Sequence, residues 1–144
     1  MSDHDALHQR IHDSFVRQGL MQHLGARLVS VTPGEVEIAL PYSERVTQQQ
    51  GGYHGGAMGA LADIAAGYAG LTQAPEGQEV ATVEYKINFL AAFQGGELRA
   101  RGHVVRAGKR LIITTAEVVH LDDDGGESPC ALMQQTLAVV PKSY

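Results

Sequence analysis

Asp63 is the residue of this chain whose position most needs a chemical explanation. It is the only charged side chain between Ala57 and Leu71, a stretch rich in Ala and Leu with few polar positions. A carboxylate is costly to bury in an apolar helix unless it is neutralised or hydrogen-bonded. A functional acid explains it best. The alternative is an Asp that binds local backbone or faces a small water pocket.

A glycine-rich segment, GGYHGG from Gly51 to Gly56, comes directly before that stretch. Glycine lets a substrate approach the backbone closely, and unpaired N–H groups at a helix start face a developing negative charge. The segment therefore predicts an oxyanion site, although many such segments are only turns. It matches neither GxxxxGK[ST] nor GxGxxG, so nucleotide phosphate binding of those kinds is not indicated.

The spacing of the two features predicts how they cooperate. Gly55 and Asp63 are eight residues apart, which is about 12 Å along one helix. They cannot both touch one carbonyl carbon. If two copies of the helix run antiparallel across an interface, Gly55 of one chain faces Asp63 of the other. The sequence thus predicts a homodimer with two equivalent, shared sites.

The elements that must position these residues follow from periodicity. A helix is expected from Asp3 to about Gln18, because the segment has no Gly or Pro and an apolar stripe of Ala6, Ile11, Phe15 and Val16. Strands are expected over 27–30 and 35–40, around a turn at 32–34, and again over 83–89, 98–105, 110–121 and 131–140. In the strand 83–89, Val83, Tyr85, Ile87 and Phe89 alternate with polar residues, which predicts one buried face.

The resulting order is a short helix, two strands, one buried helix and four strands. That order predicts an α+β fold in which an antiparallel sheet wraps around a single helix. With 144 residues, we expect a single domain over 1–144, with the helix of the first twenty residues packed on it.

Composition excludes several classes of function. The formal charge of −5 and the pI near 5.7 do not favour a polyanion, so no nucleic-acid partner is expected. The start MSDHDALHQR lacks the apolar core of a signal peptide, and no stretch approaches a membrane span, so neither secretion nor a membrane is indicated. Cys130 is the only cysteine, which excludes an internal disulfide and fits a reducing cytoplasm.

Two further features of the sequence contain residue types that could form a site. His4, His8 and His12 share one face of the first helix, a spacing that could hold a metal between neighbours, but no carboxylate or Cys is placed to complete a closed site. Cys130 is interpreted as a small buried residue, because no triad can be assembled around it. No metal site is predicted.

The motif spacing identifies a family. Gln48, five residues, His54-Gly55-Gly56, six residues and Asp63, followed by the strand ATVEY from Ala81, resemble the PaaI-like branch of the hotdog-fold acyl-CoA thioesterases. The resemblance extends over nearly the whole chain. It implies the hotdog fold, in which a sheet wraps a long helix and two sheets join edge to edge.

The resemblance also implies a role for each residue of the motif. The Gly55 N–H, helped by the side-chain amide of Gln48, would polarise the thioester carbonyl; many PaaI-like members have Asn in place of this Gln. Asp63 would activate water as general base or attack as nucleophile. Thr82 would hold the attacking water, since a hydroxyl both donates and accepts; the alternative is an ordinary strand Thr. His54 would hydrogen-bond the loop or the substrate, with structural support as the equal alternative.

A basic turn could serve the coenzyme. Arg106, Lys109 and Arg110 surround Gly108 in an otherwise acidic chain, which suits the phosphates of CoA. The family resemblance supports this placement. The alternative is a solvated hairpin tip whose charges serve solubility.

The expected activity is hydrolysis of an acyl-CoA or aryl-CoA thioester to free acid and CoA. No cofactor is expected beyond the CoA of the substrate, and the expected assembly is a homodimer, possibly a dimer of dimers. Two alternatives remain open at this point. One is an acyl-CoA-binding module without turnover, and the other is a thioester hydratase or dehydratase that uses His54 and an acid.

Overall fold

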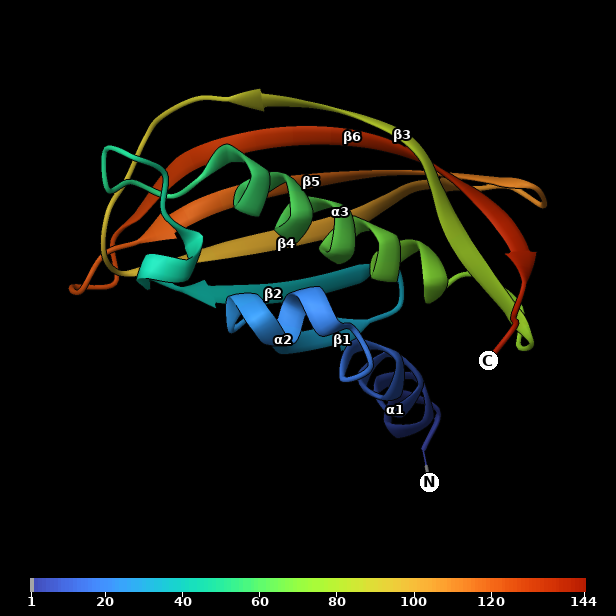
Figure 1. Ribbon diagram of the computed structural model, residues 1–144. Coiled ribbons are helices and arrows are strands. Elements are labelled where there is room, and N and C mark those ends of the chain that lie inside the picture. The colour runs from blue at the N-terminus through green and yellow to red at the C-terminus, as the bar shows by residue number, and fades with distance from the viewer. Residues whose placement is uncertain (1) are drawn as a thin grey trace.

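The computed structural model describes residues 2–144, and Met1 lies outside the described residues. One antiparallel sheet of six strands curls around a long helix (Figure 1). The strands are β1 Arg27–Thr32, β2 Glu35–Pro41, β3 Gln78–Phe89, β4 Glu97–Ala107, β5 Leu111–Leu121 and β6 Glu127–Pro141. The helices are α1 Asp3–Phe15, α2 Gly19–Leu24, the 3-10 turn η1 Glu44–Val46 and α3 Gly55–Leu71. The expected sheet wrapped around one helix is confirmed.

The strand order, β1-β2-β4-β5-β6-β3, does not follow the chain. β4 pairs with β2, whereas β3 crosses to the far edge and pairs with β6. β3 is therefore an edge strand, and the chain that enters it comes directly from the end of α3 (Figure 1).

Helix α3 begins at Gly55, two residues before the expected start at Ala57. Glycine is a weak helix former, but the first turn is capped by His54, whose Nδ1 accepts the Gly56 N–H at 2.7 Å. The cap places Gly55 at the first helical position. Both glycines thus belong to the helix that carries Asp63.

The helix lies close against the sheet because both surfaces are built from small residues. A Cβ placed on Gly102 of β4 would lie 2.4 Å from the backbone oxygen of Ala65. Ala62, Ala66 and Ala69 of α3 are fully buried. Only glycine can occupy position 102 at this separation, and this contact fixes the height of α3 above the sheet.

Helix α1 ends at Phe15, three residues before the expected end near Gln18, and the separate α2 was not predicted. Ile11 and Phe15 are buried as their spacing suggests, but Val16 is 47% exposed. The α1 helix is capped by Ser2, whose side chain accepts the N–H of Asp5.

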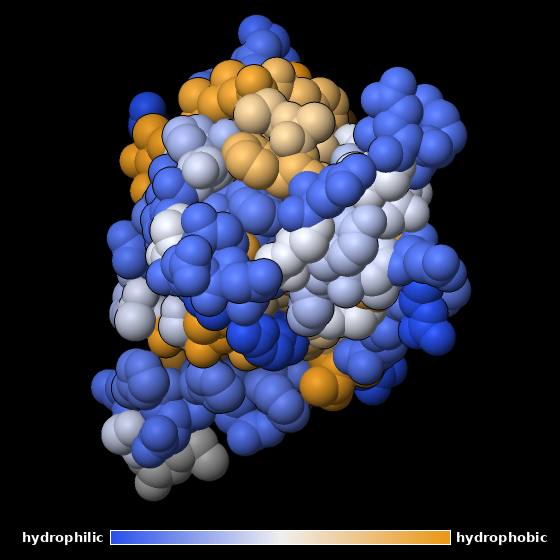
Figure 2. Space-filling model, turned by 90° about the vertical axis from the view of Figure 1, so that its left-hand side faces the viewer, coloured by the Kyte–Doolittle hydropathy of each residue, from blue (hydrophilic) through white to orange (hydrophobic). Residues whose placement is uncertain are grey.

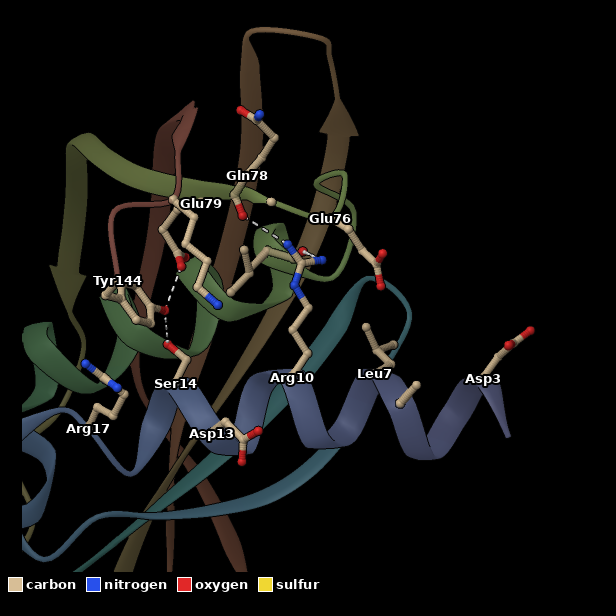
Figure 3. Close-up of a pocket in the computed structure, with 14 residues that line it drawn as sticks. Asp3, Leu7, Arg10, Asp13, Ser14, Arg17, Glu76, Gln78, Glu79 and Tyr144 are labelled. Carbon is tan, nitrogen blue, oxygen red and sulfur yellow. Dashed lines mark hydrogen bonds between the residues drawn. The ribbon is translucent and has the colours of Figure 1, made fainter. Parts of the chain in front are cut away.

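Hydrogen bonds from the Arg10 side chain connect α1 to the end of α3. Its guanidinium donates to the backbone oxygens of Ala74 at 2.9 Å and of Pro75 and Gln78 at 3.1 Å. A further bond reaches the oxygen of Leu71, the last residue of α3, at 3.3 Å. Figure 3 shows this side chain crossing from α1 to the start of β3. These carbonyls follow a helix end, where unpaired acceptors favour a cation.

The predicted buried face of the strand 83–89 is wrong for the single chain. Val83, Tyr85 and Phe89 are 59%, 41% and 53% exposed. A bulge leaves Val83 unpaired between Thr82 and Glu84 and reverses the parity there, and the edge position leaves the other side chains without a neighbouring strand. Figure 2 shows an apolar patch at the top of the molecule, where Figure 1 places the end of β3.

Candidate active site

Asp63 lies in the middle of α3 with its carboxylate directed at the inner face of β3 and β6. The Thr82 hydroxyl of β3 donates to Asp63 Oδ1 at 2.7 Å. The side-chain amide of Gln135 on β6 donates to the same oxygen, and lies 3.3 Å from the Asp63 backbone oxygen. The structure thus brings Asp63 and Thr82 together, as two of the residues predicted from the motif.

Gln135 and its neighbour Thr114 are the polar residues that the sequence interpretation missed. Both are completely buried, and the Thr114 hydroxyl donates to Gln135 Oε1 at 2.9 Å. One signal could have found Gln135. Along β6 the inner positions 131, 133 and 137 are apolar, and Gln135 interrupts that parity.

The two carboxylate oxygens of Asp63 differ in their surroundings. Oδ1 accepts from both Thr82 and Gln135, whereas Oδ2 has no hydrogen-bond partner within residues 2–144. Since an ionised carboxylate only accepts hydrogen bonds, Oδ2 is the oxygen available to take a proton or attack.

A cavity of about 440 Å³ adjoins the Asp63 carboxylate. Ile64, Gly67 and Val80 contribute an apolar part of its lining. Its far side carries the Tyr68 hydroxyl, which accepts from Gln18 Nε2 at 2.9 Å. Burial raises the pKa of Tyr68, which keeps the phenol neutral. The cavity is large enough to hold a small organic group.

A second cavity, of about 700 Å³, lies between α1 and the start of β3 (Figure 3). Tyr144 lines both cavities, and its hydroxyl donates to Glu79 Oε2 at 2.7 Å and lies 3.2 Å from Ser14 Oγ. The ring of Tyr144 therefore stands at the boundary between the two cavities.

The glycine end of α3 forms a separate group of residues. The Gly56 N–H is taken by His54, while the Gly55 N–H has no acceptor within the described chain, residues 2–144. The ring of Phe89 lies over this residue, since a Cβ on Gly55 would be 3.2 Å from Phe89 Cζ. His54 thus has a clear structural role as helix cap.

Gln48 lies in the turn before this helix. Its backbone N–H donates to the Gly52 oxygen at 2.9 Å and its oxygen accepts the Gly51 N–H at 3.0 Å. Its side-chain Oε1 accepts the Gln50 N–H. The oxygen of the amide is thus occupied, and its Nε2 group has no acceptor within residues 2–144.

One chain does not bring the two groups together. Gly55 and Asp63 lie in the same continuous helix, and their separation of eight residues corresponds to about 12 Å. The Asp63 carboxylate and the Gly55 N–H of one chain therefore lie at different places along α3.

The basic residues lie in the turn between β4 and β5. Arg106, Lys109 and Arg110 are all exposed, and the Gly108 N–H donates to the Leu111 oxygen at 2.8 Å to close the turn. Figure 1 places this turn at the end of the sheet opposite the segment that precedes α3. The turn is therefore remote from Gln48 and Gly55 of the same chain.

The two weaker candidates have simple surroundings. His8 and His12 stack with ring centroids 6.1 Å apart, and no group of three His, Cys, Asp or Glu within residues 2–144 could hold a metal ion. Cys130 is fully buried, which confirms its expected burial. Burial raises the pKa of its thiol and so disfavours the nucleophilic thiolate.

The sequence of this chain is similar to those of known proteins. Residues 50–127, more than half of the chain, match the family model described as the thioesterase superfamily. This chain belongs to the thioesterase superfamily. It is also 31% identical over 106 residues to a protein of Saccharolobus solfataricus named as an esterase, covering 74% of each. Its identity to the 1,4-dihydroxy-2-naphthoyl-CoA hydrolase of Listeria monocytogenes is 28% over 124 residues, 86% of this chain and 98% of the relative.

Solved structures agree with this assignment. The structure is similar to that of a thioesterase family protein from Silicibacter pomeroyi, with a TM-score of 0.90 and 38% identity over 94% of this chain and 99% of the other. Its fold is also that of the E. coli PaaI protein, with a TM-score of 0.86 at 22% identity and 99% coverage of both chains. The hotdog fold is confirmed, and so is the expected family of thioesterases.

None of the helices within residues 2–144 is long and apolar enough to cross a membrane.

Proposed function

We propose that this thioesterase hydrolyses an acyl-CoA or aryl-CoA thioester, with Asp63 as the catalytic carboxylate. One observation carries the proposal: a carboxylate in an apolar helix has one oxygen held by two side chains and the other free beside a cavity. Water attacks the carbonyl carbon, the C–S bond breaks, and the products are the free acid and CoA. No cofactor is needed for this reaction.

Asp63 and Thr82 together suit an attacking water. Thr82 donates its only proton to Asp63 Oδ1, so its remaining lone pairs can only accept. A water that donates one hydrogen to Thr82 and the other to Asp63 Oδ2 keeps its own lone pair for the carbonyl carbon. Asp63 then acts as general base. Direct attack by Oδ2 is the alternative role of the same oxygen.

The Gly55 N–H and the Gln48 amide supply the oxyanion site in this proposal. Neither donor has an acceptor within residues 2–144. The Gln48 side chain is held through its Oε1, which leaves its Nε2 group free to donate. A free N–H in the first turn also lies at the positive end of the helix dipole, which favours a developing negative charge. His54 supports the loop as cap rather than moving a proton.

The active unit is proposed to be a homodimer. Because about 12 Å of helix separates Gly55 from Asp63, a complete site needs Gly55 of one chain beside Asp63 of its partner. The exposed apolar side chains of the edge strand, Val83, Tyr85 and Phe89, favour burial against a second copy of that edge.

The substrate's two ends are assigned on chemical grounds. The cavity beside Asp63 suits the acyl or aryl group, and the relative from Listeria is named as a hydrolase of an aryl-CoA. The exposed cations Arg106, Lys109 and Arg110, with the turn closed by Gly108, suit the phosphates of CoA. The chain as a whole is acidic, so this basic turn is a local region of positive potential that would attract the phosphates of CoA.

The test is a hydrolysis assay with short, medium, long and aromatic acyl-CoAs, following release of the CoA thiol. Wild-type protein should turn over at least one class, and Asp63→Asn should lose at least about 100-fold in kcat while keeping its fold and dimer. A variant that retains more than about a tenth of wild-type kcat contradicts the role of Asp63. Binding of an acyl-CoA without turnover would instead identify a binding module.

A further inference from the structure

Gln135 is a fully buried amide whose side chain faces the carboxylate that the proposed reaction uses. Burying an amide is costly unless its polar atoms are satisfied. Here both ends are: Nε2 donates to Asp63, and Oε1 accepts from Thr114 at 2.9 Å. The side chain is thus a bridge between β5 and α3.

The chemistry of the three groups fixes which way the amide points. An ionised Asp63 can only accept hydrogen bonds, so it requires the NH₂ end of Gln135. Gln135 Oε1 then faces Thr114, and the threonine hydroxyl must donate to it. Reversal of the amide would place Oε1 against the carboxylate, with two acceptors in contact. Thr114 therefore selects the amide orientation that serves Asp63.

This arrangement decides which oxygen of Asp63 reacts. Thr82 and Gln135 approach the same oxygen, Oδ1, from the two neighbouring strands β3 and β6. With two donors on one oxygen, the carboxylate plane cannot rotate freely, and Oδ2 stays directed away from them. Charge-assisted bonds of this kind are stronger than neutral ones.

We propose that Gln135, oriented by Thr114, is a positioning residue that locks the Asp63 carboxylate with Oδ1 occupied and Oδ2 presented to the reacting water or carbonyl. This inference rests on the proposed function of Asp63. It adds two residues, from strands β5 and β6, that no motif around the helix contains. They act through Asp63 and do not touch the substrate.

The first variant is Gln135→Leu, which keeps the approximate size of the side chain and removes its donor. Asp63 then keeps only Thr82, and a carboxylate displaced by a fraction of an ångström reacts more slowly. We expect kcat to fall by about 10- to 100-fold, with KM changed less than about threefold because substrate contacts remain. Gln134→Leu, at the exposed neighbouring position, is the matched control and should keep wild-type kcat.

The second pair of variants isolates the orientation. Thr114→Val keeps the shape of the side chain but removes the hydroxyl, so the Gln135 amide can reverse; kcat should fall by about 3- to 30-fold. Thr114→Ser restores the donor and should recover most of the activity. In the double variant Gln135→Leu/Thr114→Val, the loss should not exceed that of Gln135→Leu alone, because both changes break one bridge.

The outcomes separate the two proposals. If Asp63→Asn abolishes turnover while Gln135→Leu stays within about twofold of wild-type kcat, the positioning role is overturned and the proposed function stands. If Asp63→Asn remains active, the proposed function itself fails. Should Gln135→Leu not fold, the comparison of Thr114→Val with Thr114→Ser decides: equal kcat in those two variants overturns the positioning role.

Discussion

The hydroxyl of Thr82 and the carboxylate of Asp63 meet at 2.7 Å, and the hydroxyl is the donor. The family resemblance implied that Thr82 holds the attacking water. The geometry adds a second task, since the only proton of this hydroxyl is already given to Oδ1. Thr82 can therefore orient the carboxylate and, through its lone pairs, receive one hydrogen of a water.

Replacement of Thr82 tests both tasks. Thr82→Val keeps the branched shape but removes the hydroxyl, and we expect kcat to fall by about 10- to 100-fold because both Asp63 and the water lose a partner. Thr82→Ser keeps the hydroxyl and should retain at least about a third of wild-type kcat. Steady-state kinetics on the best acyl-CoA measure both. Equal activity of Thr82→Val and wild type would refute the assignment.

The oxyanion donor can be removed without breaking the helix. Gly55 occupies the first helical position, after a cap in extended conformation with ψ of 135°, a place where proline is well tolerated. Gly55→Pro deletes the N–H, and kcat should fall by about 100- to 1,000-fold. Gly55→Ala brings a similar crowding of Phe89 but keeps the N–H, so it should lose much less. Equal losses in both variants would mean that crowding, not the donor, is responsible.

Mixed dimers test whether the sites are shared between chains. A chain carrying Gly55→Pro and a chain carrying Asp63→Asn are each inactive as homodimers. If the sites are shared, a mixed dimer has one intact site. Random mixing makes half of the dimers mixed, each with one of two sites working, so activity should recover to about a quarter of wild type. Differently tagged chains purified in tandem enrich that species. No recovery in tandem-purified mixed dimers would place each site within one chain.

Alanine substitutions at Gly102 and Gly67 should change the stability of the fold in opposite directions. A Cβ at Gly102 would meet the backbone oxygen of Ala65 at 2.4 Å, and backbone cannot move aside cheaply. Gly102→Ala should lower the free energy of unfolding by about 1–3 kcal/mol. Gly67, in the middle of α3, has nothing within 4 Å of its added Cβ, and Gly67→Ala should raise stability by about 0.5–1 kcal/mol. Denaturant titrations measure both, and a stable Gly102→Ala would show that the helix can lift off the sheet.

An ion pair between Arg101 and Glu127 on the outer face of the sheet should make the stability of the fold depend on pH. Hydrogen bonds from Arg101 lower the pKa of Glu127 below its ordinary value of 4.5. A carboxyl group with a lowered folded-state pKa stabilises the fold above its unfolded pKa, and that stability is lost as pH falls through the folded value. The Tm difference between wild type and Glu127→Gln should therefore be largest near about pH 6 and shrink toward about pH 3.

Glu117 provides the matched control for this measurement, because its Oε1 lies 3.9 Å from the Arg101 guanidinium and makes the weaker contact. Glu117→Gln should change the pH profile of Tm less than Glu127→Gln does. A Tm difference for Glu127→Gln that does not vary with pH would contradict the ion-pair explanation.

The sequence by itself determined the parts that depend on local pattern. A lone charged residue in an apolar stretch located Asp63, and glycine clustering located the start of α3 to within two residues. Alternation and turn residues placed the strands, because a strand's side-chain period of two is a local property. The family followed from the spacing of Gln48, Gly55 and Asp63, which is also read along the chain.

Only the tertiary structure decided what surrounds those residues. Gln135 lies 72 positions from Asp63, and its contact depends on β6 being flanked by β5 and β3, an order that crosses the chain. The same order makes β3 an edge strand and leaves Phe89 exposed, against the prediction from its alternation. Strand pairing is settled by packing over the whole sheet, so no local pattern encodes it. For this reason the sequence could name Asp63 as the proposed catalytic carboxylate, while the fold alone showed the side chains that hydrogen-bond to it.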